Sequence, residues 1–253
     1  MGLRCLVQQV LSLPSLPPGL YLNLITPTLW RIKRYTLGAG SNVLLYKYKS
    51  PKPLEHLLDI LSEERLYCPE YRALNDPFEG QFFSIFAVPL WFSVEHGFPA
   101  VPSSKRPASI EELAYQTGNR HVCSLSSTVS DVRMWSLYAD GHRGVALEID
   151  FDNFDESPRK VSYVESLTEW GTTLLAGATP EQVLSCKTDH WRYECEYRVI
   201  GSQHYLPIKG RLRRILLGVR ASESLAGVLA KLAPRNVAII RTELDHGGVS
   251  VRA

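Results

Sequence analysis

The sequence lacks the cysteine patterns that would indicate a disulfide framework or a zinc site. Its five cysteines are an odd number, they are widely spaced, and no CxxC pair occurs among them. Disulfide-rich and zinc-binding domains need closely spaced, matched cysteines. Cys123 and Cys195 fall at strand-like positions, where a free cysteine packs as a small apolar residue. The pattern favours a reducing, cytoplasmic setting.

Long apolar runs are also missing. No stretch reaches the 18 or so apolar residues of a membrane-spanning helix, so we expect no membrane span. The first 24 residues contain an apolar stretch interrupted by three prolines, without the continuous core of a signal peptide. We therefore expect residues 1–40 to be an N-terminal extension of uncertain order and residues 41–253 to form a single domain.

Several catalytic signatures do not occur. The seven histidines are scattered without HExxH or HxH spacing, and there is no GxSxG, no Walker loop and no GxGxxG. We expect no metal site and no certain cofactor. The net charge is +2, from 28 basic and 26 acidic residues, which gives no strong signal for nucleic-acid binding. These absences leave the small-molecule or protein target unknown.

Short strand-like and helix-like segments make up most of the interpretable sequence. Residues 43–48 and 145–151 have the β-branched, aromatic or alternating pattern of strands, whereas 53–64 and 221–232 show helical spacing of apolar residues. Strict alternation of strand and helix is missing. The sequence therefore predicts an α+β fold with a bent, mostly antiparallel or mixed sheet flanked by short helices.

Residues 121–151, HVCSLSSTVSDVRMWSLYADGHRGVALEIDF, contain the clearest single unit: strand, polar turn, helical turn, glycine turn and strand. Ser124 and Ser126 alternate on one face of the first strand, and Tyr138 and His142 follow the helical turn. Polar side chains at such junctions can converge on a ligand. We expect all four to line one cleft, with Trp135 packed in the core.

The segment WRYECEYRVI, residues 191–200, alternates like a strand and places Glu194, Glu196 and Arg198 in one row. Paired carboxylates can divide catalytic roles when their environments differ. The competing interpretation is a polar outer strand face with a Glu196–Arg198 ion pair. If the row is functional, both glutamates should face the same cleft as Ser124, Tyr138 and His142.

The turn Asn75-Asp76-Pro77 also has two interpretations. Asn and Asp form Asx-turns and Pro fixes its own φ, so the segment is a strong turn signal. We favour a structural turn that holds Phe78 in the core over a loop that supplies Asn75 or Asp76 to a pocket.

Five sequence blocks together resemble the bacterial family called domain of unknown function 2971. They are LLYKYKS (44–50), LYCPEYRALNDPFEG (66–80), CSLS with MWSLYADGHRGVALEID (123–150), VSY (161–163), and Lys187 followed by WRYECEYRVI. The resemblance covers roughly residues 43–250. Members of the family look like effector proteins of mobile elements, and some are described as abortive-infection or phage-resistance proteins, so the resemblance implies a defence role.

A weaker resemblance is to ADP-ribosyltransferases, in which a strand with a basic residue, a strand with a serine motif and a strand with ExE follow in this order. It implies that Lys47 or Lys49 holds NAD, that Ser124 and Ser126 shape the nicotinamide pocket, and that Glu196, assisted by Glu194, is catalytic. The sequence departs from the pattern because a lysine replaces the expected arginine or histidine.

Two further hypotheses remain open. In the first, the protein is a non-catalytic sensor or interaction module of a defence system, and a ligand or protein binds in the same cleft without turnover. A nuclease would instead need Asp76, Asp140, Glu148 and Glu196 to gather around a metal ion.

Overall fold

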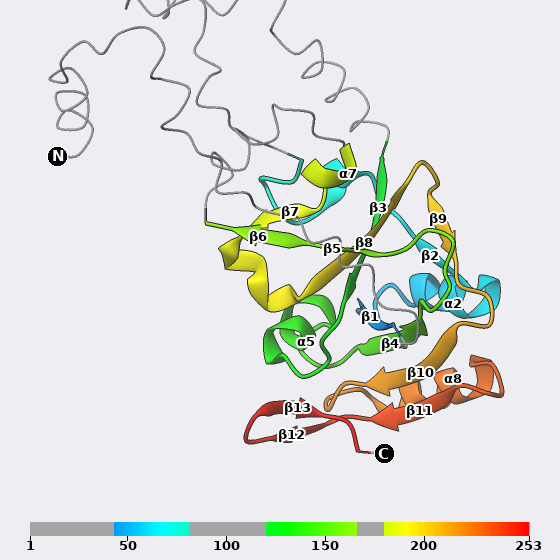
Figure 1. Cartoon of the computed structure of the whole chain (residues 1–253). Helices are drawn as coiled ribbons and strands as arrows, with labels where there is room; N and C mark the ends of the chain where they lie inside the picture. Colours follow the sequence, from blue (N-terminus) through cyan, green and yellow to red (C-terminus); the bar gives the residue numbers. More distant parts are fainter. Residues whose placement is uncertain (1–42, 81–119, 166–179, 253) are drawn as a thin grey trace, which may run out of the picture. The chain divides into compact units, whose positions relative to one another are not determined.

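The computed structural model describes residues 43–80, 120–165 and 180–252 (Figure 1). The prediction for residues 1–40 lies outside the described residues.

A seven-stranded sheet forms the centre of the described chain, in the order β11-β10-β4-β1-β3-β8-β5 (Figure 1). Neighbouring strands are antiparallel except β10 and β11, which are parallel. Its strands are β1 (Leu44–Lys49), β3 (His121–Ser126), β4 (Val145–Asp150), β5 (Arg159–Lys160), β8 (Glu196–Gly201), β10 (Leu212–Leu217) and β11 (Ala238–Arg241). With short helices on its faces, this sheet confirms the predicted α+β class.

Three two-stranded sheets and six helical segments complete the described elements. The small sheets pair β2 (Arg65–Tyr67) with β9 (Tyr205–Pro207), β6 (Ser162–Val164) with β7 (Cys186–Thr188), and β12 (Glu243–Asp245) with β13 (Gly248–Ser250). The helices are α2 (Leu54–Glu63), α5 (Val132–Tyr138), α7 (Pro180–Val183) and α8 (Glu223–Leu232), with 3-10 turns η1 (Tyr71–Ala73) and η3 (Asp189–Glu194).

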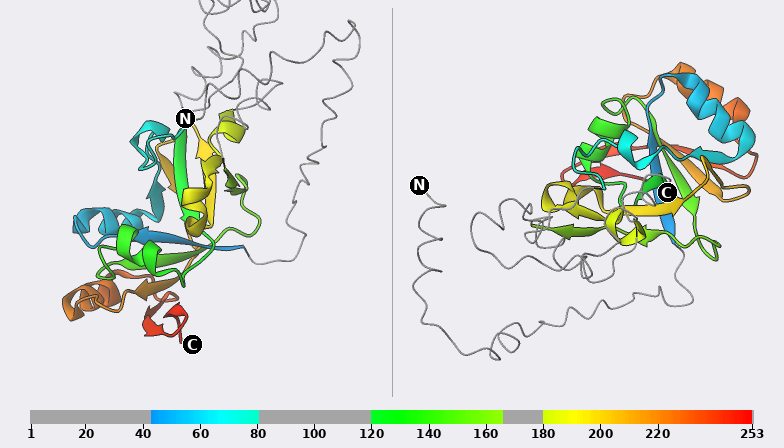
Figure 2. Two further views of the ribbon diagram at one scale, coloured as in Figure 1. Left: turned by 90° about the vertical axis from the view of Figure 1, so that its left-hand side faces the viewer. Right: turned by 90° about the horizontal axis from the view of Figure 1, so that it is seen from above.

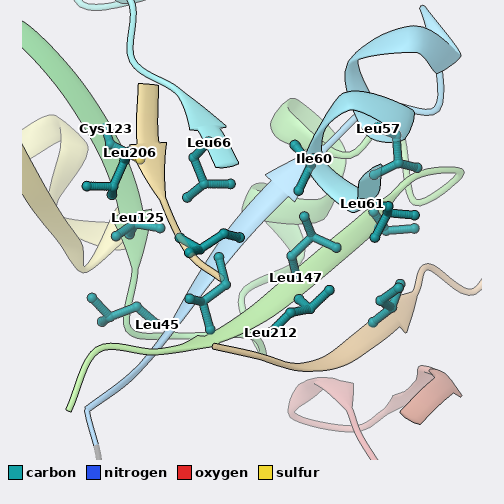
Figure 3. Close-up of a cluster of buried hydrophobic side chains, with 14 of the residues drawn as sticks. Leu45, Leu57, Ile60, Leu61, Leu66, Cys123, Leu125, Leu147, Leu206 and Leu212 are labelled. Atoms are coloured by element: carbon teal, nitrogen blue, oxygen red, sulfur yellow. The ribbon is translucent and has the colours of Figure 1, made fainter. Parts of the chain in front are cut away.

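The main core lies on one face of the large sheet. Leu45 of β1 and Leu147 of β4 are buried there against Leu57, Ile60 and Leu61 of α2, whose spacing puts these three side chains on one side of the helix (Figure 3). α8 covers another part of the same cluster, and its N-terminus is capped by Ser222, whose side chain accepts from the N–H of Leu225. A second cluster, built around Trp135 of α5, covers the other face.

The sheet divides between β1 and β3. β1 pairs with β4 along its whole length, but its register with β3 has one pair, Tyr46 opposite Ser126. β3 in turn pairs with β8 along its whole length. Figure 2 shows β3 crossing the direction of β1 and β4. The sheet is therefore bent, as predicted, and its two parts open away from each other beside Ser126.

Two short segments change their secondary structure within a few residues. Residues 159–164 form two strands in different sheets, β5 and β6, because Val161 between them donates its N–H to the carbonyl of Glu196 and turns its side chain into the interior. The helix α7 ends at Val183, and β7 follows at Cys186.

Gly144 is required where the turn after α5 meets the end of β1. A Cβ at this position would lie 2.1 Å from the backbone oxygen of Lys49. A backbone atom cannot move aside in the way that the end of a flexible side chain can. We expect Gly144→Ala to lower the free energy of unfolding by about 1–3 kcal/mol, the usual cost of overpacking. Urea denaturation measures this change in the free energy of unfolding.

Gly227 in the middle of α8 is the matched control, since a Cβ there would meet nothing within 4 Å. Gly227→Ala should raise the free energy of unfolding by about 0.5–1 kcal/mol because alanine restricts the unfolded chain and favours the helix. Equal denaturation midpoints for Gly144→Ala and the unmodified chain would contradict the contact at Gly144.

Candidate functional site

A pocket of about 240 Å³ lies where β1 and β3 separate. Strands supply one wall and the segments around η1, α5 and η3 supply the others. The lining residues are Tyr46, Lys47, Tyr48, Ala73, Leu74, Asn75, Ser124, Leu125, Ser126, Met134, Tyr138, Lys187, Glu194 and Glu196. Six of the seven residues that the sequence singles out therefore surround one cavity.

Glu194 and Glu196 reach this pocket from different elements. Glu194 ends η3, Cys195 adopts a left-handed conformation with φ 45°, and β8 begins at Glu196. The prediction of one continuous strand with both glutamates in a row is therefore wrong. The kink at Cys195 nevertheless leaves both carboxylates beside the pocket.

A buried lysine joins the two glutamates. The Nζ of Lys187, from β7, lies 2.7 Å from Oε2 of Glu194 and 2.9 Å from Oε2 of Glu196. All three side chains are at most 5% exposed. An ammonium group this deeply buried is retained because the carboxylates compensate for its lost hydration. The pKa of Lys187 is raised, since attraction to Glu196 and Glu194 exceeds the opposing effect of burial.

Arg198 holds Glu196 from the other side. Its Nε donates to Oε1 of Glu196 at 2.8 Å and its Nη2 to Oε2 at 3.1 Å. The same guanidinium donates to both carboxylate oxygens of Glu79, at 2.5 and 2.8 Å. Arg198 is fully buried, so these bidentate pairs are shielded from water. The Glu196–Arg198 ion pair was one prediction, but it lies inside the protein and not on an outer face.

Tyr138 and Asn75 continue this network to the rim of the pocket. The Tyr138 hydroxyl donates a short hydrogen bond to Oε1 of Glu194 and accepts one from Nδ2 of Asn75 at 2.5 Å. Phe78, expected in the core, is 46% exposed. The structural interpretation of the Asn75-Asp76-Pro77 turn is thus wrong in part, because the turn directs Asn75 to Tyr138.

The two glutamates differ in their affinity for a proton. Burial opposes ionisation of Glu196, but Arg198 and Lys187 overcome it and lower its pKa to about 2. Burial raises the pKa of Glu194 above its ordinary value, with Lys187 and Tyr138 opposing. Glu196 is therefore the ionised member of the pair, and Glu194 is the member that takes up a proton more readily.

The pKa of Glu196 makes stability depend on acidity. Because its folded-state value is depressed from 4.5 to about 2, Glu196 stabilises the fold above its unfolded pKa and loses this contribution as pH falls towards 2. The raised pKa of Glu194 acts in the opposite sense. We expect the difference in free energy of unfolding between the unmodified chain and Glu196→Gln to shrink between neutral pH and about pH 3. Urea denaturation at both values tests it; a constant difference would contradict the assignment.

The remaining predicted residues differ in their part in the site. Ser124 lines the pocket together with Glu196, Ser126 pairs with Glu196 in the ladder between β3 and β8, and the Oγ of Ser126 donates to the backbone carbonyl of Glu194 at 2.6 Å. The Nζ of Lys47 donates to the backbone carbonyl of Ser124 at 2.8 Å, across the gap between β1 and β3. The serine strand is thus attached to both glutamates.

His142 does not line the pocket, contrary to expectation. After α5 the chain folds back, with the N–H of His142 bonded to the carbonyl of Trp135 at 3.2 Å. This turn stacks the imidazole against the indole, with ring centroids 6.2 Å apart and planes 12° apart. The imidazole therefore packs against Trp135 and does not line the pocket.

Lys187, Asn75 and Glu79 are site residues that sequence reasoning did not assign. Lys187 had a signal, since it stands alone between small and polar residues just before the glutamates. Asn75 was named only in the disfavoured interpretation of its turn, as one of two residues that a loop would supply to a pocket. Glu79 had no signal, because its partner Arg198 is 119 positions away.

The carboxylates that a nuclease would need are not gathered in the described part of the chain. Within those residues, no three or more His, Cys, Asp or Glu side chains are placed to hold a metal ion. Glu148 is instead paired with Arg214. Among the helices described, none has the length and apolarity required to cross a bilayer.

Comparison with family models, curated proteins and solved structures found no significant match to this chain. Functional inference therefore starts from the geometry of the pocket.

Proposed function

We propose that the protein is a cytoplasmic NAD-using enzyme that breaks the bond between nicotinamide and ribose, as an ADP-ribosyltransferase or an NAD glycohydrolase. One observation carries the proposal. Lys47, Ser124 and Glu196 come from the neighbouring strands β1, β3 and β8 and meet at one pocket. This is the combination of basic, serine and glutamate strands on which the resemblance to ADP-ribosyltransferases depends.

The charge of the site suits this reaction. Cleavage of the nicotinamide–ribose bond develops positive charge on the ribose, as in other glycoside cleavages. Three carboxylates, Glu79, Glu194 and Glu196, face two buried cations, Lys187 and Arg198, so the fully ionised network carries one net negative charge. A fixed negative charge beside the pocket stabilises the developing cation more strongly than water does.

The size of the pocket indicates which part of NAD it encloses. Pockets that bury a drug-sized ligand measure roughly 300–1,000 Å³. At about 240 Å³, this cavity accommodates the nicotinamide–ribose end and leaves the adenylate end outside. The Tyr48 and Tyr138 side chains and Leu74 provide ring and apolar surface, while Asn75 and Ser124 provide polar groups for orientation.

Glu194 is placed to receive the proton of an acceptor. Its raised pKa makes it the stronger base of the pair, and Tyr138 connects it to the pocket rim. A hydroxyl or water beside Tyr138 can pass its proton to the phenolic oxygen while the phenolic proton moves to Glu194. Glu196 remains ionised and acts by charge alone.

Purified full-length protein incubated with NAD should release nicotinamide, detected by chromatography, or transfer radiolabelled ADP-ribose to proteins of a cell lysate. NAD binding is measured separately by calorimetry. The proposal is overturned if NAD neither binds nor loses nicotinamide under either condition.

One observation favours a second candidate, a binding module without turnover. Glu196 is 3% exposed and already accepts two hydrogen bonds from Arg198 besides its contact with Lys187. A carboxylate this fully engaged can serve as a fixed support for the pocket. This candidate would be favoured if NAD binds without release of nicotinamide and if Glu194→Gln leaves the affinity for NAD unchanged.

The resemblance to the domain of unknown function 2971 family is what supports a role as a phage-defence effector. On this proposal, expression of the unmodified chain arrests bacterial growth and Glu196→Gln relieves the arrest. If growth arrest persists with Glu196→Gln at equal expression, the toxicity does not depend on the pocket.

A further inference from the structure

Two free thiols lie together in the core beside the pocket. Cys68 and Cys123 are both free, 5% and 0% exposed respectively, and belong to the same buried cluster. The Sγ of Cys68 donates to the backbone carbonyl of Leu66 at 3.6 Å. Figure 3 labels Cys123 among the side chains of this cluster. The proposed NAD chemistry uses neither thiol.

The backbone places the two cysteines opposite each other. Glu70 and His121 form an antiparallel bridge, and the N–H of Val122 donates to the carbonyl of Pro69 at 2.9 Å. Continuing this register by two residues brings Cys68 opposite Cys123 at a non-hydrogen-bonded position. Cα atoms at such positions are about 4.5 Å apart, at the short end of the roughly 4.4–6.8 Å range of disulfides.

The surroundings favour a reactive form at Cys123. Its interaction with the Cys68 thiol lowers its pKa, burial opposes this, and the Lys47 and Lys49 ammonium groups lower it further, to about 7. The pKa of Cys68 is raised by the same interaction and by burial. Cys123 is thus the attacking sulfur and Cys68 the partner thiol. By contrast, burial raises the pKa of Cys186 to about 12.

We propose that Cys68 and Cys123 form a peroxide-oxidised dithiol site. The Cys123 thiolate attacks one oxygen of hydrogen peroxide, the O–O bond breaks, and the released hydroxide takes up a proton to leave as water, giving a sulfenic acid on Cys123. The Cys68 sulfur then attacks the sulfenic sulfur, a disulfide forms, and the hydroxyl leaves with the Cys68 proton as a second water. Two thiols are oxidised and one peroxide is reduced.

The disulfide would join two walls of the pocket. Cys68 precedes the segment that carries Asn75, and Cys123 directly precedes Ser124. The bond would fix the distance between this segment and β3. The inference does not depend on the proposed NAD chemistry, and its test uses no NAD.

The experiment treats the reduced, folded full-length chain with hydrogen peroxide, then denatures and alkylates it and maps the peptides by mass spectrometry. We expect loss of two of the five thiols together, a linked Cys68–Cys123 peptide as the main product, and its reversal by dithiothreitol. Cys68→Ser should abolish the linked peptide and leave a trapped sulfenic acid on Cys123. Cys195→Ser, which changes a half-exposed thiol, should still form the link.

Oxidation of the chain unfolded in urea provides the second measurement. There the five cysteines should pair in several ways, so an excess of the Cys68–Cys123 link in the folded chain reports the native geometry. The proposal is overturned if the folded chain forms no such link, or if the link is no more abundant than in the unfolded chain.

Discussion

Replacing Glu196 by Gln is expected to lower the rate of nicotinamide release from NAD by about 10²- to 10³-fold, the usual effect of losing one preorganised electrostatic group. Glu196 is the ionised carboxylate of the pocket, with a pKa of about 2. Gln has the same size and can still accept hydrogen bonds, but it removes the charge that faces the developing cation. NAD binding should change far less than the rate, because the cation forms in the transition state.

The fold should survive this substitution. Without the charge on Glu196, Arg198 still pairs with Glu79 and Lys187 still pairs with Glu194. Glu243→Gln, at a glutamate whose side chain is 47% exposed beside Arg252, is the matched control and should leave the rate unchanged. If Glu196→Gln releases nicotinamide as fast as the unmodified chain, Glu196 has no electrostatic role in the reaction.

The strands of the large sheet could be predicted from local sequence because each has a pattern with period two. In β3, Cys123 and Leu125 enter the main core while Ser124 and Ser126 turn to the pocket, as their alternation indicated. The same reasoning placed a helix before the glycine turn and another after Ser222. These signals depend on neighbours within a few residues, so contacts with distant parts of the chain do not alter them.

The position of Glu194 could not be predicted in this way. The letters of residues 191–200 alternate as a strand would, but the first part of the segment is the 3-10 turn η3. A left-handed conformation at Cys195, uncommon for a residue with a side chain, separates the two parts. Cys195 sits between Glu194, which faces Tyr138 and Lys187, and Glu196, which begins the ladder with β3. Tertiary contacts thus decide the conformation there.

The network behind the pocket was also beyond sequence reasoning. Its members Asn75 and Glu79 lie far along the chain from Glu194 and Arg198, and long-range pairing leaves no periodic signal. His142 shows the converse. It has the residue type of a site and lies near Tyr138 in sequence, yet the turn stacks it on Trp135. Residue type indicated which chemistry is possible, whereas the bend of the sheet determined which side chains line the pocket.

Replacing Arg198 by Met is expected to lower the free energy of unfolding by about 3–5 kcal/mol, the typical cost of removing one partner from a buried ion network. Arg198 is fully buried and is the bidentate partner of both Glu79 and Glu196. Among the described residues, Arg198 is the cation paired with Glu79, so Glu79 loses this partner and Glu196 keeps Lys187. Urea denaturation at neutral pH measures the loss.

Arg213→Met is the matched control. Arg213 makes an ion pair with Asp150, but its side chain is 49% exposed, so water replaces the lost interaction. We expect a change of about 0–1 kcal/mol, as for other surface ion pairs. If Arg198→Met and Arg213→Met lower the free energy of unfolding equally, burial of the network contributes nothing to the effect of replacing Arg198.

The combined substitution Glu79→Gln, Arg198→Met and Glu196→Gln separates two origins of that cost. If uncompensated buried charge is responsible, removing the two carboxylate charges together with the guanidinium should restore most of the lost stability, because whole buried ion sets are often replaced at little cost. Lys187 keeps Glu194 as its partner in this variant, so no cation is left alone. If the triple variant is as unstable as Arg198→Met, the loss comes from the packing and hydrogen bonds of the guanidinium, and the network's charge is not what holds β8 to the loop of Glu79.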